Sequence, residues 1–304
     1  MSKNRPKFIM LGGLPASGKS TYAKQIEAPC NIVSSDFIRE QLYGNESVQG
    51  NSADVFEIVH DKIIQHLSEN ENVVLDATNL SRKYRNHLLS KLKKFDVEKQ
   101  YVLLATHPDI CKERNATRNR TVPNYVYDNM IRSFNVPLKS EGWDYIDIVY
   151  GYIPSTYTIE QYKERINGYN QENPHHSQDL LGHVMSVRDK AIAEMPAEPV
   201  MRYAALLHDC AKPFTKVFNT IKGIPTEHAH YYGHDNYGAW ESLFYTANHL
   251  TNTRQILDVA TLIEFHMRPY FAKTEKAKNK IKNLLGEDLY YMLEILHRAD
   301  VESH

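Results

Sequence analysis

A glycine-rich octapeptide near the start of the chain constrains the fold more than any other feature. Residues 13–20 read GLPASGKS and fit the pattern G-x-x-x-x-G-K-[ST]. The apolar run FIML at 8–11 precedes them and predicts a buried strand, and a helical pattern follows them. A strand, a glycine-rich turn and a helix N-terminus together aim backbone N–H groups at phosphate oxygens. The pattern therefore predicts a phosphate-binding loop in an α/β domain.

The side chains of this loop predict that it binds ATP with Mg²⁺. Lys19 can reach the β and γ phosphates, and the Ser20 hydroxyl can hold the metal ion. Further contacts to the nucleotide are expected from Gly13, Ala16, Ser17, Gly18 and Thr21. The alternative is a glycine-rich loop that fits the pattern by chance. The complete pattern between an expected strand and an expected helix argues against this alternative.

Short apolar runs alternate with helical patterns through the first half of the chain. Further strands are expected at 31–35, 72–79, 100–106 and 145–153, and helices at 53–68 and 82–94. Strands that are continuously apolar and alternate with helices predict a parallel sheet that is covered on both faces. From about residue 160 only helical periodicity remains. We therefore expect an α/β P-loop domain over residues 1–155 and an all-α domain over 160–304.

Composition excludes several classes of protein. No segment of the 304 residues approaches the roughly 18 uncharged residues of a membrane helix, and the N-terminus does not resemble a secretory signal. Cys30, Cys111 and Cys210 show no pairing pattern, which favours a reducing compartment. We expect a cytoplasmic protein without a membrane partner. The net charge of −1 argues against a broad basic surface for duplex DNA but leaves a local basic groove open.

Acidic and basic residues follow the second and third expected strands. Asp36 and Arg39 stand at the carboxyl edge of the sheet, where ligands bind in parallel α/β folds. A carboxylate there can take the proton of an attacking hydroxyl, although Asp36 also suits a helix N-cap. Asp76 follows the apolar run of the third expected strand, and we expect its carboxylate to order either the ligands of Mg²⁺ or the acceptor site. Thr78 and Asn79 either bond a substrate or form a loop turn.

Two arginines, Arg114 and Arg118, are spaced four residues apart. This spacing places them on one face of a helix. Paired arginines before a mobile loop suit a lid that closes over the triphosphate and stabilises charge at the transferring phosphate. The alternative is a solvated basic helix face.

These four motifs together resemble the 5′-kinase domain of the phage-type polynucleotide kinase family. The matching strings are GLPASGKST, SDFIR, LDATN, and R-N-x-x-R followed by Val-Pro, and they cover roughly residues 6–150. The resemblance implies that the chain phosphorylates 5′-hydroxyl ends of RNA or DNA with ATP. It implies that Asp36 is the general base and that Arg39 contacts the acceptor's 3′-phosphate. Arg114 and Arg118 would contact the ATP phosphates.

Histidine concentrates in the second half of the chain, where eleven of the 15 lie after residue 150. His208 and Asp209 are adjacent in AALLHDCAKP, and Pro213 predicts a helix end there. The other candidate ligands in sequence order are His183, His234, His266 and Asp300. Imidazole and carboxylate suit a transition metal such as Mn, Fe, Co, Ni, Cu or Zn far better than Ca²⁺. Single histidines of this kind are often structural, but the ordered set predicts a metal site.

This ordered set resembles the HD phosphohydrolase superfamily, and in particular the HD domain appended to CCA-adding enzymes, over about residues 175–304. Three strings carry the resemblance: His183 to Arg188, Ala205 to Pro213, and His234 to Ala239. The resemblance implies two metal positions bridged by Asp209, the first also held by His183, His208 and Asp300, the second by His234 and His266. Lys212 would bind a substrate phosphate. His228 and His230 remain rivals for the place of His234.

Together the two resemblances imply a bifunctional end-healing enzyme for RNA repair. The kinase would restore the 5′-phosphate, and the HD domain would clear 2′,3′-cyclic phosphate or 3′-phosphate ends. A separate RNA ligase would complete the repair, because the chain has no ligase lysine motif. One alternative is an HD nucleotide phosphohydrolase with a regulatory P-loop ATP-binding domain, and another is an ATP-gated RNA-binding sensor. Asp36 with Arg39 favours phosphoryl transfer.

Overall fold

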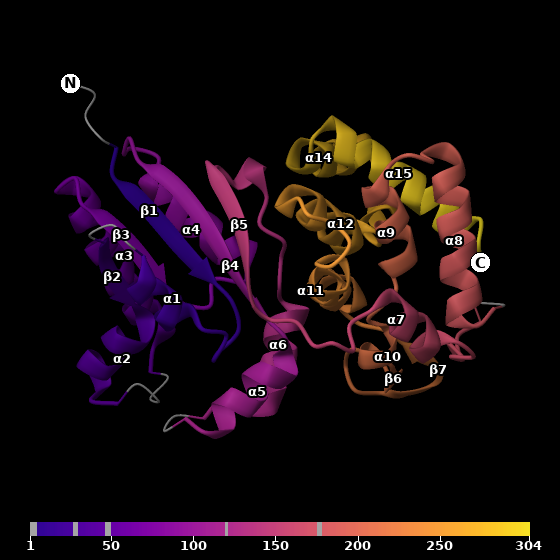
Figure 1. Cartoon of the computed structure of the whole chain (residues 1–304), viewed down its shortest axis with the longest axis horizontal. Helices are drawn as coiled ribbons and strands as arrows, with labels where there is room; N and C mark the ends of the chain where they lie inside the picture. The colour runs from indigo at the N-terminus through magenta and orange to yellow at the C-terminus, as the bar shows by residue number, and fades with distance from the viewer. Residues whose placement is uncertain (1–4, 27–29, 46–49, 119–120, 175–177) are drawn as a thin grey trace. The chain divides into compact units, whose positions relative to one another are not determined.

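The computed structural model describes residues 5–26, 30–45, 50–118, 121–174 and 178–304 (Figure 1). The chain forms two compact units. The first combines Met1–Met130 with Pro137–Ile153, and the second combines Ile131–Val136 with Pro154–His304. Among the described residues, no helix has both the length and the apolar character needed to cross a membrane.

The first unit is built on a five-stranded parallel sheet with the order β2-β3-β1-β4-β5. The strands are β1 (Lys7–Gly12), β2 (Cys30–Ser34), β3 (Asn72–Asp76), β4 (Glu98–Thr106) and β5 (Tyr145–Tyr152). The register pairs Asp76 with Leu11 on one side and with Ser34 on the other. The carboxyl ends of the three strands that carry the predicted motifs are therefore level with one another. The predicted parallel α/β sheet is confirmed.

Helices connect these strands. They are α1 (Lys19–Gln25), α2 (Ser35–Tyr43), α3 (Ser52–Ser68), α4 (Arg82–Leu92), α5 (Pro108–Ala116), α6 (Asn124–Arg132) and the 3₁₀ turn η1 (Lys139–Glu141). Helix α3 shows why the sequence folds this way. It buries Val55, Val59 and Ile63, which are spaced four residues apart and form one apolar face. The side chain of Asn51 caps its N-terminus by accepting a hydrogen bond from the backbone N–H of Ala53.

The second unit is largely helical. Its helices are α7 (Ile159–Ile166), α8 (Leu180–Glu194), α9 (Pro199–Leu207), α10 (Lys212–Thr215), α11 (His234–Thr246), α12 (Thr253–Phe265), α13 (Arg268–Phe271), α14 (Glu275–Leu285) and α15 (Glu287–Val301). The expected helical periodicity fails over residues 217–230. There β6 (Val217–Asn219) and β7 (Pro225–His230) form an antiparallel pair. These strands are short and bury only one of their residues, Ala229, so they carry no continuous apolar run that would reveal them in the sequence.

A short stretch from the first half of the chain, Ile131–Val136, belongs to the core of the second unit. The Phe134 ring packs edge-on against Trp240, with ring centroids 5.0 Å apart. The buried carboxylate of Glu264 accepts hydrogen bonds from the backbone N–H of Val136 at 2.7 Å and from Asn135 Nδ2 at 3.0 Å. A buried carboxylate is costly unless it is hydrogen-bonded in this way. This stretch is thus held by apolar packing and by a satisfied buried charge.

Candidate functional site

The phosphate-binding loop joins β1 to α1, and two glycines give it its shape. Gly13 has φ 149°, and a Cβ there would lie 2.7 Å from Ser17 Oγ. Gly18 precedes α1 with φ 102°, a conformation that glycine adopts at little cost. The loop is fixed from both sides, because the Gly13 N–H donates to the Thr78 carbonyl at 2.9 Å and Thr106 Oγ1 donates to the Ser17 carbonyl at 2.9 Å.

Lys19 lies buried inside this loop. Its Nζ donates to the carbonyls of Gly13 at 3.1 Å and Leu14 at 2.7 Å. Burial lowers the pKa of Lys19; nearby Asp76 and Asp36 oppose this shift, and Arg118 adds to it. These predicted site residues therefore lie close enough to Lys19 to act on its charge. Ser17 Oγ is buried without a hydrogen-bond partner among the described atoms, as expected for a group that a ligand would satisfy.

Asp36 and Arg39 lie together in the first turns of α2. Arg39 Nη1 donates to Asp36 Oδ1 at 3.1 Å, and the Asp36 side chain is 45% exposed. The guanidinium of Arg39 is buried, and its Nε has no partner among the described atoms. Asp36 is not the N-cap of α2, because Ser34 takes that place and accepts from the Phe37 N–H at 3.4 Å. Asp36 therefore presents an accessible carboxylate that the helix does not need as a cap.

The residues after β3 divide into two roles. Asp76 ends the strand and is buried. Asn79 has φ 45°, and its Nδ2 donates to the Leu11 carbonyl at 2.7 Å, so its amide fixes the end of β1. The Thr78 carbonyl bonds the Gly13 N–H. These contacts favour the loop-turn alternative for Thr78 and Asn79, while Asp76 remains a candidate for the Mg²⁺ shell.

The expected pairing of Arg114 and Arg118 on one helix face is wrong, because α5 ends at Ala116. Both arginines are exposed. Asn115 between them, whose role sequence reasoning missed, forms two hydrogen bonds of 2.9 Å with the backbone of Val122. Asn115 therefore holds the backbone of Val122 against the end of α5. Part of the expected lid, residues 119–120, lies outside the described residues.

The candidate metal ligands of the second unit come from three helices and from the residues that directly follow α9 and α12, and all are buried. His183 lies on α8, His208 and Asp209 directly follow α9, His234 begins α11, His266 directly follows α12, and Asp300 lies near the end of α15. The predicted helix end at His208 is confirmed. His234 belongs to the cluster, whereas His228 is exposed and the His230 ring stacks on Tyr232. The structure thus favours His234 over both of its rivals.

The cluster has two halves that share Asp209. The Asp209 Oδ2 atom lies 3.4 Å from His183 Nε2 and 3.3 Å from His208 Nε2. The Oδ1 atom lies 3.4 Å from His234 Nε2 and 3.8 Å from His266 Nε2. Each half is a group of three side chains whose ligand atoms lie within 4.8 Å of one another. One carboxylate therefore faces two pairs of imidazoles, as a bridging ligand would.

Asp300 distinguishes the two halves electrostatically. Its Oδ1 atom lies 3.2 Å from His183 Nε2 and 3.6 Å from His208 Nε2. The first half therefore contains two carboxylates, whereas the second half contains only a share of Asp209. Burial lowers the pKa of His208, but Asp209 and Asp300 outweigh burial and raise that pKa to about 10. Burial and the neighbouring His234 and His208 instead lower the pKa of His266 to about 4.

The histidine tautomers fit a bound cation. The Nδ1 atoms of His208, His234 and His266 lie 2.7–2.8 Å from backbone carbonyls three residues earlier. A carbonyl only accepts, so each Nδ1 carries a hydrogen and each Nε2 is left to bind a proton or a metal ion. The Nε2 atoms of His234 and His266 are 3.1 Å apart, and those of His183 and His208 are 3.3 Å apart. Paired lone pairs repel unless a proton or a metal ion lies between them, and this donor set suits a transition metal.

Lys212 and three residues that sequence reasoning missed surround these ligands. Lys212 is buried and lies 2.7 Å from Asp209 Oδ2, and its Nζ donates to Gln171 Oε1 at 2.6 Å. Tyr270 donates its hydroxyl to Asp300 Oδ2 at 2.9 Å. The His304 ring stacks on His183 with centroids 5.1 Å apart. Gln171, Tyr270 and His304 carry no motif, so only the folded structure reveals their places.

Comparisons with known proteins concern the first half of the chain. Residues 8–137 match the family model described as AAA domain. An L-seryl-tRNA(Sec) kinase of Methanococcus maripaludis is 30% identical over 172 residues, which are 53% of this chain and 63% of that protein. The chain thus spans less than two thirds of this relative's length. The first half of the chain is a P-loop domain.

Similarities to solved structures are weaker. The Pnkp1/Rnl/Hen1 RNA repair complex contains a chain with 21% identity and a TM-score of 0.37, covering 42% of this chain and 43% of its own. A putative kinase from Chloroflexus aurantiacus has 12% identity and a TM-score of 0.40, covering 48% of this chain and 89% of its own. At these values, neither similarity carries an argument about function.

Proposed function

We propose that this protein is a bifunctional nucleic-acid end-healing enzyme. The P-loop unit would be an ATP-dependent 5′-hydroxyl kinase, and the helical unit a metal-dependent phosphohydrolase that clears 2′,3′-cyclic phosphate or 3′-phosphate ends. The observation that carries the proposal is one chain with two groups of residues suited to phosphate chemistry. One contains Lys19 with the Asp36–Arg39 pair, and the other contains two histidine pairs around Asp209.

In the kinase reaction, the loop backbone and Lys19 would hold the ATP phosphates, and the Ser20 hydroxyl would hold Mg²⁺. Asp36 would accept the proton of the acceptor hydroxyl as that oxygen attacks the γ-phosphorus and ADP leaves. Its 45% exposed carboxylate and its electrostatic effect on Lys19 support this role. Arg39 has a buried Nε without a hydrogen-bond partner among the described residues, which suits an anionic group of the acceptor. Arg114 and Arg118 would stabilise charge on the transferring phosphoryl group.

A second acceptor is suggested by the similar protein of Methanococcus maripaludis, which is named as an L-seryl-tRNA(Sec) kinase. A serine hydroxyl carried by a tRNA and the 5′-hydroxyl of an RNA end offer the same nucleophile on the same class of polymer. Asp36 and Arg39 would perform the same roles on either acceptor. The two acceptors therefore differ in what lies beyond the hydroxyl, and a direct comparison of substrates separates them.

In the hydrolase reaction, metal bound at the cluster would supply a hydroxide nucleophile at neutral pH and a positive charge for the phosphate. The buried histidines and the two carboxylates would orient that metal, and Tyr270 would hold Asp300 through its 2.9 Å hydrogen bond. Lys212 now pairs with Asp209 at 2.7 Å. With a cation held by Asp209, Lys212 would be able to pair with a substrate phosphate instead. A separate RNA ligase would join the healed ends.

End analysis of labelled oligonucleotides tests both activities. One arm offers ATP and Mg²⁺ with a 5′-hydroxyl oligonucleotide, as RNA or DNA, or with seryl-tRNA. The other offers 3′-phosphate and 2′,3′-cyclic phosphate ends with Mn²⁺, Co²⁺, Ni²⁺, Cu²⁺ or Zn²⁺. We expect phosphate transfer to a 5′-hydroxyl and hydrolysis of a 3′ end. Phosphate transfer to seryl-tRNA alone would identify seryl-tRNA as the acceptor instead of a 5′-hydroxyl end. Hydrolysis of mononucleotides without any phosphate transfer would favour the alternative in which the P-loop domain is regulatory.

Variants of the P-loop unit separate an enzyme from an ATP-gated sensor. Lys19→Ala and Asp36→Asn should each slow phosphate transfer by about 100-fold or more. Arg118→Lys should also impair it, because lysine cannot replace a planar, bidentate contact. A sensor that only closes around ATP would keep its RNA response in Asp36→Asn, whereas the enzyme would lose its product.

A further inference from the structure

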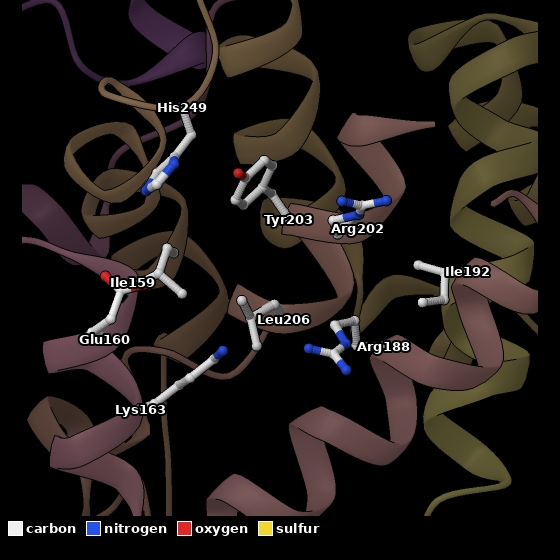
Figure 2. Close-up of a pocket in the computed structure, with 9 residues that line it drawn as sticks. All are labelled: Ile159, Glu160, Lys163, Arg188, Ile192, Arg202, Tyr203, Leu206 and His249. Carbon is white, nitrogen blue, oxygen red and sulfur yellow. The ribbon is translucent and has the colours of Figure 1, made fainter. Parts of the chain in front are cut away.

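A groove in the second unit has no part in the two sites described above. Its volume is about 380 Å³, within the roughly 300–1,000 Å³ that is usual for small-molecule sites. Figure 2 shows the side chains that line it, which come from α7, α8, α9 and the segment after α11: Ile159, Glu160, Lys163, Arg188, Ile192, Arg202, Tyr203, Leu206 and His249.

The groove lies on different helix faces from the histidine–aspartate cluster. On α8, Arg188 and Ile192 stand five and nine positions after His183, which turns them by roughly 140° and 180° around the helix axis. On α9, Tyr203 stands five positions before His208, again roughly 140° away. The same two helices therefore offer the metal ligands on one side and this groove on another.

The charge of the groove is predominantly positive. Lys163, Arg188 and Arg202 line it together with His249, and Glu160 is the one acidic residue among its lining residues. The side chains of Lys163 and Arg202 form no hydrogen bond or ion pair with the part of the chain that the structure describes. Arg188 pairs with Asp189, at 2.6 Å, which does not line the groove. Several cations thus surround a space in which little negative charge opposes them, an arrangement that attracts an anion.

The remaining lining residues are apolar and aromatic. The rings of Tyr203 and His249 lie 5.4 Å apart at 30° to each other. Ile159, Ile192 and Leu206 supply aliphatic surface beside these rings. A nucleotide matches this lining, because its base can stack on an aromatic side chain while its phosphate contacts lysine and arginine. Stacking of this kind tolerates any base. A simple inorganic anion would use the cations but not the rings.

We propose that this groove binds a nucleotide unit, with its phosphate held by Lys163, Arg188 and Arg202 and its base stacked beside Tyr203 and His249. The same chemistry is offered by an internal nucleotide of a single-stranded RNA and by a free nucleoside monophosphate. Binding here does not depend on either proposed reaction, because the groove shares no residue with the P-loop or with the metal ligands.

Fluorescence anisotropy with the full chain tests this site. The probe is a single-stranded RNA decamer whose 5′ end is blocked by the dye, measured without ATP or added metal. The groove variant is Lys163→Gln with Arg202→Gln. The matched control is Lys222→Gln with Arg254→Gln, which removes the same charge from exposed positions outside the groove. Circular dichroism and metal content verify that each variant is folded.

We expect the groove variant to weaken RNA binding and the control to leave it nearly unchanged. The magnitude of the slope of log K against log salt concentration should fall by about 0.7 in the groove variant, since the lost contact to one phosphate accounts for about 0.7 on a single strand. Tyr203→Ala should raise the Kd by about 5- to 150-fold through lost stacking.

A second arm identifies the source of the nucleotide by titrating AMP into the same proteins. RNA binding that depends on the groove identifies a strand, and groove-dependent binding of AMP alone identifies a free nucleotide. Equal RNA and AMP affinities in the groove variant and its control would overturn the proposal.

Discussion

Replacing Asp209 with asparagine tests the central feature of the proposed metal site. The substitution keeps the shape of the side chain but removes a charge that lies within 3.3–3.8 Å of four imidazole nitrogens. A charge pair about 4 Å apart is worth about 4 kcal/mol per elementary charge at an effective dielectric constant of 20. At 1.4 kcal/mol per tenfold change, we expect Asp209→Asn to weaken metal binding by about 1,000-fold or more.

The same substitution leaves Lys212 buried without its partner carboxylate, which lies 2.7 Å away in the native protein. Breaking one side of a buried ion pair typically costs about 3–5 kcal/mol of unfolding free energy. Lost metal in the single variant could therefore reflect lost folding. The double variant Asp209→Asn with Lys212→Met removes both charges and should recover most of this stability without recovering the metal.

Mass spectrometric metal analysis and urea denaturation of both variants provide the measurement. His228→Ala serves as a control, because His228 is exposed and lies outside the cluster. We expect native metal content in the control and little metal in either Asp209 variant, with kinase activity retained in all of them. A double variant that is folded and holds as much metal as the native protein would refute the bridging role.

The other expectations concern both units. Asp36→Asn should abolish phosphate transfer while metal content stays native; wild-type rates would exclude Asp36 as the base. Tyr270→Phe should lower metal affinity by about 10- to 100-fold by releasing its carboxylate partner, and an unchanged affinity would show that Tyr270 is not needed there. Burial and, to a lesser extent, the nearby Lys91 charge lower the pKa of His60 to about 4. Between pH 6.5 and 4 the unfolded chain therefore binds a proton at this residue that the folded chain does not, and acidification over this range should reduce the unfolding free energy by up to about 3 kcal/mol. Denaturation of His60→Gln across this range should show a flatter profile. A fragment of residues 1–155 should transfer phosphate but hold no transition metal, and a folded fragment that transfers no phosphate would contradict the proposed division.

The parallel sheet could be predicted because its strands are buried on both faces. The runs at 8–11 and 101–105 are apolar without interruption. β1 and β4 extend the strands expected at 8–11 and 100–106 by no more than two residues at either end. The strands at 217–219 and 225–230 escaped prediction because only Ala229 among their residues is buried, so no apolar run marks them. The expected position of Arg118 on a helix was wrong because no glycine or proline in the sequence marks the end of α5 at Ala116.

The residue types of the cluster could also be predicted, because imidazole and carboxylate side chains suit a transition metal. The residues that orient those ligands could not. Gln171 and Tyr270 are common residue types that reach Lys212 and Asp300 only after the chain has folded. The helix end at His208 was an exception, since Pro213 revealed it in advance.

The position of His208 and His266 at helix ends explains how their tautomers are fixed without further residues. The last carbonyls of a helix have no partner within it. His208 follows α9 and bonds the Ala205 carbonyl at 2.8 Å, and His266 follows α12 and bonds the Ile263 carbonyl at 2.7 Å. Each imidazole therefore satisfies a helix end with Nδ1 and turns Nε2 towards Asp209. Ending each helix and orienting its ligand are one structural event, so a substitution that extends either helix by a turn would displace the ligand even if the histidine were kept.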